Sequence, residues 1–200
     1  MKRFALALAT AAAIAGCASK GDVPPAPVKA AVPSYQYRIG PGDSVQIQVW
    51  RNPELSATVP VRPDGKLTSP LIEDLPAMGH TPTQLARDVE GVLKKYIQDP
   101  VVTVIVNGFV GMSSEQVRIV GSATRPSALP YRQNMTLLDA MIMVGGITEF
   151  ASGNKTVLLR TSEGNKEYNV RIRDLLQRGD VTANVDLLPG DILIIPESFF

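Results

Sequence analysis

A Pro-Gly-Asp triplet that leads directly into a strand pattern occurs twice in this chain of 200 residues. The first copy, Pro41-Gly42-Asp43, precedes residues 45–49, in which apolar and polar side chains alternate. The second copy, Pro189-Gly190-Asp191, precedes the apolar residues 192–195. Proline fixes one φ angle and glycine supplies a positive one, so each pair predicts the centre of a type II turn. With 16 glycines and 16 prolines in all, the chain is expected to form short strands joined by many turns.

Charge and composition exclude several classes of function. The 20 Lys and Arg residues nearly balance the 19 Asp and Glu residues, for a formal net charge of +1. Nucleic acid is therefore not an expected partner, because phosphate binding requires clustered basic residues. One cysteine and one histidine allow neither an internal disulfide nor a zinc cluster of Cys and His ligands. We expect no metal and no cofactor.

The N-terminus has the features of a secretory signal. Lys2 and Arg3 precede an apolar run over residues 4–15, which is too short to span a bilayer. The run ends in Ile14-Ala15-Gly16-Cys17, which resembles the bacterial lipobox, so residues 1–16 are predicted to be a signal peptide and Cys17 a lipidated N-terminus. An ordinary signal peptide with a leftover thiol is the alternative. Ala18 and Ser19 follow the cysteine, and the absence of Asp there favours the outer membrane.

Residues 17–34 are predicted to be a tether between the lipid and the folded protein. The segment is rich in Pro and Ala and has no periodicity, which is typical of an extended polyproline-like chain. At roughly 3.1 Å per residue such a tether reaches about 50 Å.

The first folded unit is predicted over residues 35–110. Pro63-Asp64-Gly65, with its turn residues Asp64 and Gly65, is expected to join strands 58–62 and 66–69 in a hairpin. Thr81, Pro82 and Gln84 predict a capped helix start, with an apolar stripe from Leu85 to Ile97 and charged residues, Glu90 among them, facing water. Asp99-Pro100 is expected to end the helix, and residues 101–106 to form an inner strand covered on both faces.

The second folded unit is predicted over residues 111–200. A turn begins at Gly121, and a second helix capped by Thr136 ends at Gly145-Gly146, where Gly145 suits a left-handed C-cap. Residues 156–160 and 167–172 are expected to form a hairpin, and residues 192–195 a central strand.

The order of these motifs resembles a known family. In the first unit they are Tyr37-x-Ile39-Gly40-Pro41-Gly42-Asp43, Pro63-Asp64-Gly65, the Leu85 helix and Asp99-Pro100-Val101-Val102. This set is similar to the polysaccharide biosynthesis/export domain of Wza-like outer-membrane export lipoproteins. In the second unit they are Val120-Gly121, Pro126, Thr136-Leu137-Leu138-Asp139-Ala140 and Gly145-Gly146, which resemble the soluble-ligand-binding β-grasp (SLBB) domain. The resemblance implies an α+β fold, a small mixed-sheet polysaccharide-export domain followed by a β-grasp domain.

What the resemblance implies about function is export without catalysis. Family members assemble as homo-oligomeric rings in the periplasm and pass polysaccharide outward with an inner-membrane chain-length-control protein. Larger members continue into a further β-grasp repeat and an amphipathic pore helix, whereas this sequence stops after Pro196-Glu197-Ser198-Phe199-Phe200. We therefore expect a separate outer-membrane β-barrel to supply the crossing.

Candidate glycan-contacting residues are Trp50, Tyr131 and Arg132, because aromatic faces suit the apolar faces of sugar rings and arginine suits acidic groups. The only histidine, His80, precedes the capped helix and is interpreted as a turn residue. Two rival functions remain open. One is a monomeric envelope glycan-binding lipoprotein without a transport role, and the other is a glycosidase using an acidic pair such as Glu73 and Asp74.

Overall fold

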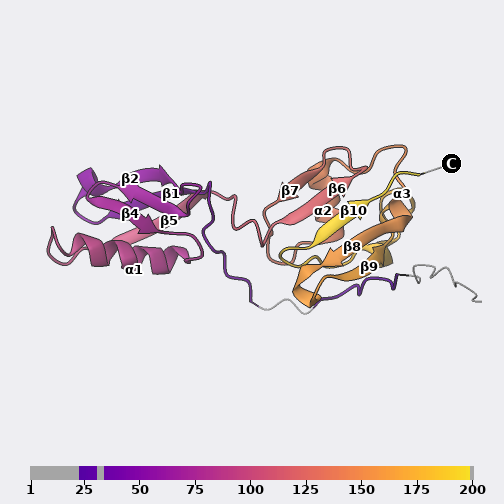
Figure 1. Ribbon diagram of the computed structural model, residues 1–200, viewed down its shortest axis with the longest axis horizontal. Coiled ribbons are helices and arrows are strands. Elements are labelled where there is room, and N and C mark those ends of the chain that lie inside the picture. The colour runs from indigo at the N-terminus through magenta and orange to yellow at the C-terminus, as the bar shows by residue number, and fades with distance from the viewer. Residues whose placement is uncertain (1–22, 31–33, 199–200) are drawn as a thin grey trace, which may run out of the picture.

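A computed structural model describes residues 23–30 and 34–198 of the chain. The predicted signal peptide and Cys17 lie outside the described residues. Figure 1 shows two units side by side along the longest axis of the molecule, with the export-like unit on the left. Each unit has its own hydrophobic core. Helices and sheets occur in both units, which confirms the predicted α+β fold.

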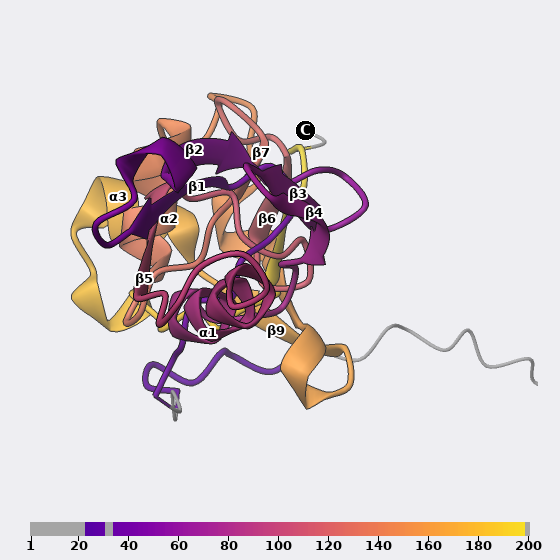
Figure 2. The same ribbon diagram turned by 90° about the vertical axis from the view of Figure 1, so that its left-hand side faces the viewer.

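The first unit is a small antiparallel sheet covered by one helix. Its central strand pairs antiparallel with a strand on each side, in the order β2-β1-β5, and a separate β3-β4 hairpin lies beside it. Viewed from that end, α1 lies below the strands (Figure 2). The elements are β1 (Ser44–Val49), β2 (Ala57–Pro60), β3 (Lys66–Ser69), β4 (Ile72–Pro76), α1 (Pro82–Leu93), β5 (Val102–Gly108) and a 3-10 turn at Pro53–Leu55.

Helix α1 begins with a reciprocal capping box. The Gln84 backbone N–H donates to the Thr81 hydroxyl at 3.2 Å, and the Thr81 N–H donates to the Gln84 side-chain oxygen at 2.9 Å. The helix ends at Leu93, so the prediction that it runs to Asp99-Pro100 is wrong. After Leu93 the backbone N–H groups of Lys95 and Tyr96 bond three residues back, to Val92 and Leu93, and these tighter turns replace the helix.

The hairpin predicted at Pro63-Asp64-Gly65 is also wrong in its partners. The turn is present, because Gly65 N–H donates to the Arg62 carbonyl at 2.9 Å, but β2 pairs with β1 and β3 pairs with β4. The β3-β4 connection passes through Leu71 at φ +61°. Leucine rarely adopts a positive φ, so the sequence gives no sign of a turn at this position.

Strand β5 lies at the edge of the described sheet, so the inner strand predicted for residues 101–106 is wrong. Its buried residues Val102 and Val104 alternate with the exposed Thr103 and Ile105, and Val101, directly before the strand, is also exposed. The sheet has a helix on only one face. The apolar side chains on the face opposite the helix, such as Ile105, are therefore exposed.

Glu90 faces the protein and not water, contrary to the prediction. It is 9% exposed, accepts the Val102 N–H at 2.9 Å and pairs with Arg87 at 2.8 Å. Its carboxyl group thereby ties α1 to the first residue of β5.

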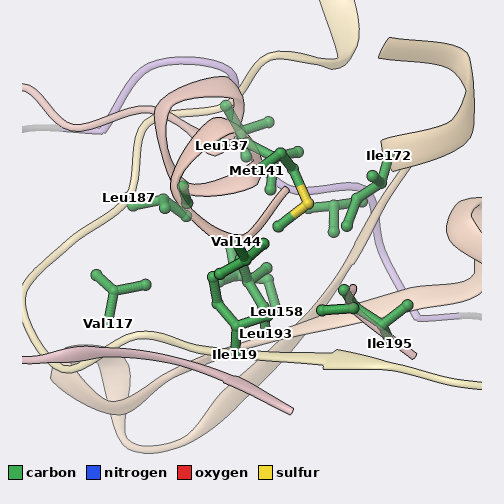
Figure 3. Packing of buried hydrophobic residues seen from close by; sticks show 14 of the residues in the cluster. Val117, Ile119, Leu137, Met141, Val144, Leu158, Ile172, Leu187, Leu193 and Ile195 are labelled. Carbon is green, nitrogen blue, oxygen red and sulfur yellow. The ribbon is translucent and has the colours of Figure 1, made fainter. Parts of the chain in front are cut away.

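The second unit has the strand order β7-β6-β10-β8-β9, with α2 packed against the sheet. Strand β10 is central and parallel to β6, whereas the other described pairs are antiparallel. The mix of parallel and antiparallel strands, which was predicted for the first unit, therefore occurs in the sheet of the second unit. Figure 3 shows Leu137, Met141 and Val144 of α2 above Ile119, Leu158 and Leu193 of the sheet. The elements are β6 (Val117–Gly121), β7 (Ser127–Leu129), α2 (Leu137–Val144), β8 (Thr156–Arg160), β9 (Lys166–Val170), α3 (Ile172–Arg178), β10 (Ile192–Ile195) and 3-10 turns at Gly153–Lys155, Thr161–Glu163 and Val181–Ala183.

Helix α2 has a defined start and stop. Thr136 accepts the Asp139 N–H while the Asp139 side chain accepts the Thr136 N–H. Gly145 ends the helix at φ +79°, and Gly146 donates its N–H to the Met141 carbonyl at 2.8 Å. These bonds satisfy backbone groups that a helix end leaves free.

The two Pro-Gly-Asp turns have the same internal bonds. Asp43 N–H donates to the Gly40 carbonyl and Asp191 N–H to the Leu188 carbonyl, each closing a four-residue turn. Each Asp side chain accepts the N–H at the start of its turn, from Gly40 and from Leu188, both at 2.8 Å. Both carboxyl groups belong to fully buried residues.

The environments of the two carboxyl groups differ. Asp43 also accepts the N–H groups of Val110 at 2.7 Å and Gly111 at 2.8 Å and the Tyr37 hydroxyl at 2.6 Å. Asp191 has Arg160, itself fully buried, at 3.5 Å, and its Oδ1 has no hydrogen-bond partner.

The N-terminal segment lies along the second unit, which corrects the free tether predicted there. Ala26 N–H donates to the Asn169 carbonyl at 3.0 Å, and Asn169 N–H donates to the Pro24 carbonyl at 2.7 Å, beside strand β9. Farther on, Asp186 accepts the Ala30 N–H at 3.2 Å and pairs with Lys29. We call residues 23–30 the strap. Because the strap is bound to the second unit, residues 23–30 do not add to the length of the predicted tether.

Asp43→Asn is expected to destabilise the first unit by about 3 kcal/mol, because a buried group that accepts several hydrogen bonds is replaced by one that also carries donors. Urea unfolding followed by the fluorescence of Trp50, the single tryptophan, measures this. Asp64→Asn, at an exposed turn of similar sequence, is the matched control and should leave the midpoint close to that of the wild type. Equal midpoints for the two variants would contradict the role given to Asp43.

Asp191 is expected to make stability depend on pH between about 4 and 6. Burial raises the pKa of Asp191 to about 6, despite the Leu188 N–H and Arg160, from an unfolded value of about 3.9. Because the folded state binds this proton more tightly, the contribution is complete below about pH 4 and lost as pH rises to about 6.

Asp191→Asn should therefore gain stability relative to the wild type across that window, by up to about 1.4 kcal/mol per pH unit, and show a constant difference above it. Urea unfolding of both proteins at pH 4, 5, 6 and 7 provides the comparison. Parallel stability curves for the two proteins would show that Asp191 does not titrate there.

Asp186→Ala is expected to release the strap. Without the Asp186 carboxyl group the Ala30 N–H loses its acceptor, and trypsin should cleave after Lys29 several-fold faster, as measured by mass spectrometry of the fragment that begins at Ala30. Glu149→Ala removes an equal charge from an exposed position of the same unit and serves as the control. Unchanged cleavage after Lys29 in Asp186→Ala would mean that the strap is held elsewhere.

Candidate functional site

The predicted glycan-contacting residues lie in two separate hollows. Tyr131 and Arg132 line one where the two units meet, and Trp50 lines another on the first unit. The structure therefore brings two of the three residues together.

The junction of the two units is built from aromatic side chains. Tyr35 packs edge-on against Tyr131, with ring centroids 4.9 Å apart, and Tyr37 packs edge-on against Phe109 at 5.3 Å. The Tyr35 hydroxyl donates to Glu115 at 3.0 Å. Edge-to-face pairs of this kind have a preferred geometry, so they help to fix the approach of the chain to the second unit.

Tyr35 and Tyr37 remain hydrogen-bond donors at physiological pH. Burial, followed by the hydrogen bond to Glu115, raises the pKa of Tyr35. Burial and the hydrogen bond to Asp43 raise the pKa of Tyr37. The protonated phenols of Tyr35 and Tyr37 can therefore donate to the Glu115 and Asp43 carboxyl groups.

The junction hollow has a volume of about 460 Å³ and is lined by Tyr37, Phe109, Pro130, Tyr131 and Arg132. Arg132 also lines an adjoining hollow of about 320 Å³ beside the start of α2. Volumes of this size fall in the range of small-molecule sites. An aromatic wall next to an exposed guanidinium can contact a sugar ring and an acidic or hydroxyl group together.

Exposure changes the roles expected within this hollow. Tyr131 is only 4% exposed, and burial is the main cause that raises the pKa of its hydroxyl, so Tyr131 forms part of the wall. Phe109 is 58% exposed, and Arg132 is also exposed. The sequence analysis did not predict Phe109 as a glycan-contacting residue, because an aromatic residue that follows an apolar strand is usually buried in the core. Gly108 and Gly111, on either side of Phe109, could have indicated that the chain leaves the sheet at this point.

Of the acidic and histidine candidates, Asp74 and His80 are engaged in structural contacts, and Glu73 is exposed on β4. Asp74 pairs with Arg62 at 2.8 Å, and His80 Nδ1 lies 3.2 Å from the Pro76 carbonyl and 3.5 Å from Asp88. Within residues 23–30 and 34–198, no group of three His, Cys, Asp or Glu side chains is arranged to hold a metal ion. No helix in the described part of the chain is both long enough and apolar enough to cross a membrane.

These features define a class of protein: an export-type α+β domain followed by an SLBB domain, with an aromatic hollow where they meet. Residues 31–107 match the family model described as Polysaccharide biosynthesis/export protein, and residues 115–195 match the SLBB domain. The chain therefore belongs to the Wza-like polysaccharide export family.

The chain is similar to curated proteins at low sequence identity. The EPS I polysaccharide export outer membrane protein EpsA of Ralstonia nicotianae is 26% identical over 186 residues, covering 80% of this chain and 47% of EpsA. The exopolysaccharide production protein ExoF of Rhizobium meliloti is 25% identical over 178 residues, covering 81% of this chain and 41% of ExoF. The chain thus spans less than half the length of these relatives.

Proposed function

We propose that this protein is a noncatalytic outer-membrane lipoprotein subunit of a capsule or exopolysaccharide export machine. One observation carries the proposal: the export domain and the SLBB domain follow one another over most of the chain. The relatives named as polysaccharide export outer membrane proteins support both the export role and the outer membrane.

The strap gives the proposed lipid anchor a definite point of attachment. Six residue steps separate Cys17 from Val23, the first strap residue, and an extended chain advances at most about 3.6 Å per residue. The proposed anchor is therefore joined to the strap by a connection of at most about 22 Å, and the strap itself lies beside β9 of the second domain. In this arrangement the SLBB domain lies nearer to the membrane, facing the periplasm.

The mechanism that we propose is geometric. Each copy contributes a wedge to a closed homo-oligomeric ring, which requires one patch to meet a different patch of the next copy. The two domains supply one patch each. The further partners in this proposal are an inner-membrane chain-length-control protein and a separate outer-membrane β-barrel. The ring confines the polysaccharide so that it moves along one axis.

The junction hollow is proposed as one surface that contacts the polymer. Phe109 offers an exposed ring, and Arg132 offers a cation that also reaches the adjoining hollow. The contact is proposed to be weak, because a transported polymer must also leave.

Deleting the gene is expected to abolish surface polysaccharide while the polymer is still synthesised in a cell-free extract. Restoring the wild-type gene should restore export. A Cys17→Ser variant should restore it poorly, because a chain without lipid loses its membrane attachment. Arg132→Ala should lower the amount exported without shifting the thermal midpoint of the purified protein, since Arg132 is exposed. Extracted surface sugar is quantified in each strain.

Normal surface polysaccharide after deletion would overturn the export role. If the protein is in addition monomeric at every concentration beside its partners, as judged by light scattering, a monomeric glycan-binding lipoprotein becomes the better description.

A further inference from the structure

The outer face of the first domain's sheet carries a second hollow, centred on Trp50. Along β1 the residues Val45, Ile47 and Val49 point into the core, so the alternate positions, which include Gln46 and Gln48, face away from α1. Trp50 follows directly at the end of the strand and is 69% exposed. The face is thus polar along the strand and ends in an indole ring.

The backbone that carries Trp50 is fixed on both sides. The Trp50 N–H donates to the Val101 carbonyl at 2.9 Å, and the Asn52 side-chain amide donates to the Trp50 carbonyl at 3.2 Å. The chain then reverses in a turn closed by Asn52 N–H and the Val49 carbonyl, with Arg51 at φ +63°. A non-glycine residue in this conformation costs about 1 kcal/mol or more, and such strain clusters at functional sites. The backbone that carries the exposed indole is therefore held in place at some cost.

The side chains around the indole are uncharged except for Arg51, and they include the apolar Val49, Pro53 and Val101 as well as polar groups. The hollow has a volume of about 440 Å³, and its lining includes the amides of Gln46 and Gln48 and the hydroxyls of Ser56 and Thr103. Arg51 is the one charged residue that lines it within the described part of the chain. Amides and hydroxyls both donate and accept hydrogen bonds, as adjacent sugar hydroxyls require.

We propose that this face, the Trp50 face, binds a hexose unit of an uncharged polysaccharide segment. The C–H face of the pyranose stacks on the indole, and Gln48 and Thr103 exchange hydrogen bonds with the ring hydroxyls. The absence of carboxyl groups and the single cation match an uncharged ligand, whereas a polyanion would call for several cations. This inference rests on the proposed export function and adds the chemical class of the polymer and a site distinct from the junction hollow.

The single tryptophan makes a direct test possible, because the intrinsic indole fluorescence of the full chain reports only this face. The probes are uncharged hexasaccharides of α-linked and β-linked glucose, galactose and mannose, with hexagalacturonate as the charged comparison. With at least one uncharged probe we expect a blue shift and a fall in acrylamide quenching by roughly half, since a stacked sugar covers one of the two indole faces. Hexagalacturonate should give neither effect.

Matched variants locate the contact. Gln48→Leu keeps the indole but removes a hydrogen-bonding amide, so the dissociation constant should rise about tenfold. Gln177→Leu makes the same change at an exposed position on α3 and should bind as the wild type does. Trp50→Ala should lose binding measured by calorimetry, and Trp50→Tyr should recover part of it.

Several outcomes would overturn the inference. They are a response to hexagalacturonate alone, no response to any uncharged probe, equal binding by Gln48→Leu and wild type, or a blue shift that depends only on protein concentration. The last result would mean that a second copy of the chain covers the Trp50 face. The export role is tested separately by the gene deletion, so either idea can fail while the other stands.

Discussion

The Asp43 carboxyl group is the contact on which the arrangement of the first domain depends. It accepts hydrogen bonds from residues on both sides of the domain: Tyr37 and Gly40 at its start, and Val110 and Gly111 at its end. The entry and exit of the chain are thereby held together by one buried group. Gly40 permits this close approach, because a Cβ atom there would lie 2.0 Å from the Gly111 carbonyl oxygen. Tyr37 and Phe109 meet at the junction as a consequence.

Asp191 also closes a turn in the second domain, but its carboxyl group has fewer hydrogen-bond donors around it than that of Asp43. Both Pro-Gly-Asp turns come directly before the central strand of their sheet, β1 in one domain and β10 in the other. Asp43 has four donors, whereas Asp191 has one backbone donor and the buried Arg160 at 3.5 Å. The same motif therefore comes before the central strand of both sheets, while the groups that surround its buried carboxyl group differ between the two domains.

Local signals in the sequence were sufficient for turns and helix caps, and insufficient for pairing and burial. The capping residues Thr81 and Thr136 act within four residues of chain, so their chemistry can be read directly. The wrong pairing at Pro63-Asp64-Gly65 arose because a turn does not specify which sheet receives its two arms. Glu90 was assigned to water by helical periodicity, but the N–H that it accepts comes from Val102, which is distant in sequence. The strap was unpredictable for the same reason, since its acceptor Asp186 lies 156 residues from Ala30.

The distribution of exposed aromatic rings follows from this architecture. Phe109 and Trp50 each follow directly after a strand of the same sheet, β5 and β1. Burying either ring within one copy would require another layer on a sheet that has only one helix. In the proposed export role, the two separate aromatic hollows would contact the polymer at two points. Weak binding at separate points lets a polymer be guided and released, which one deep and tight site would prevent.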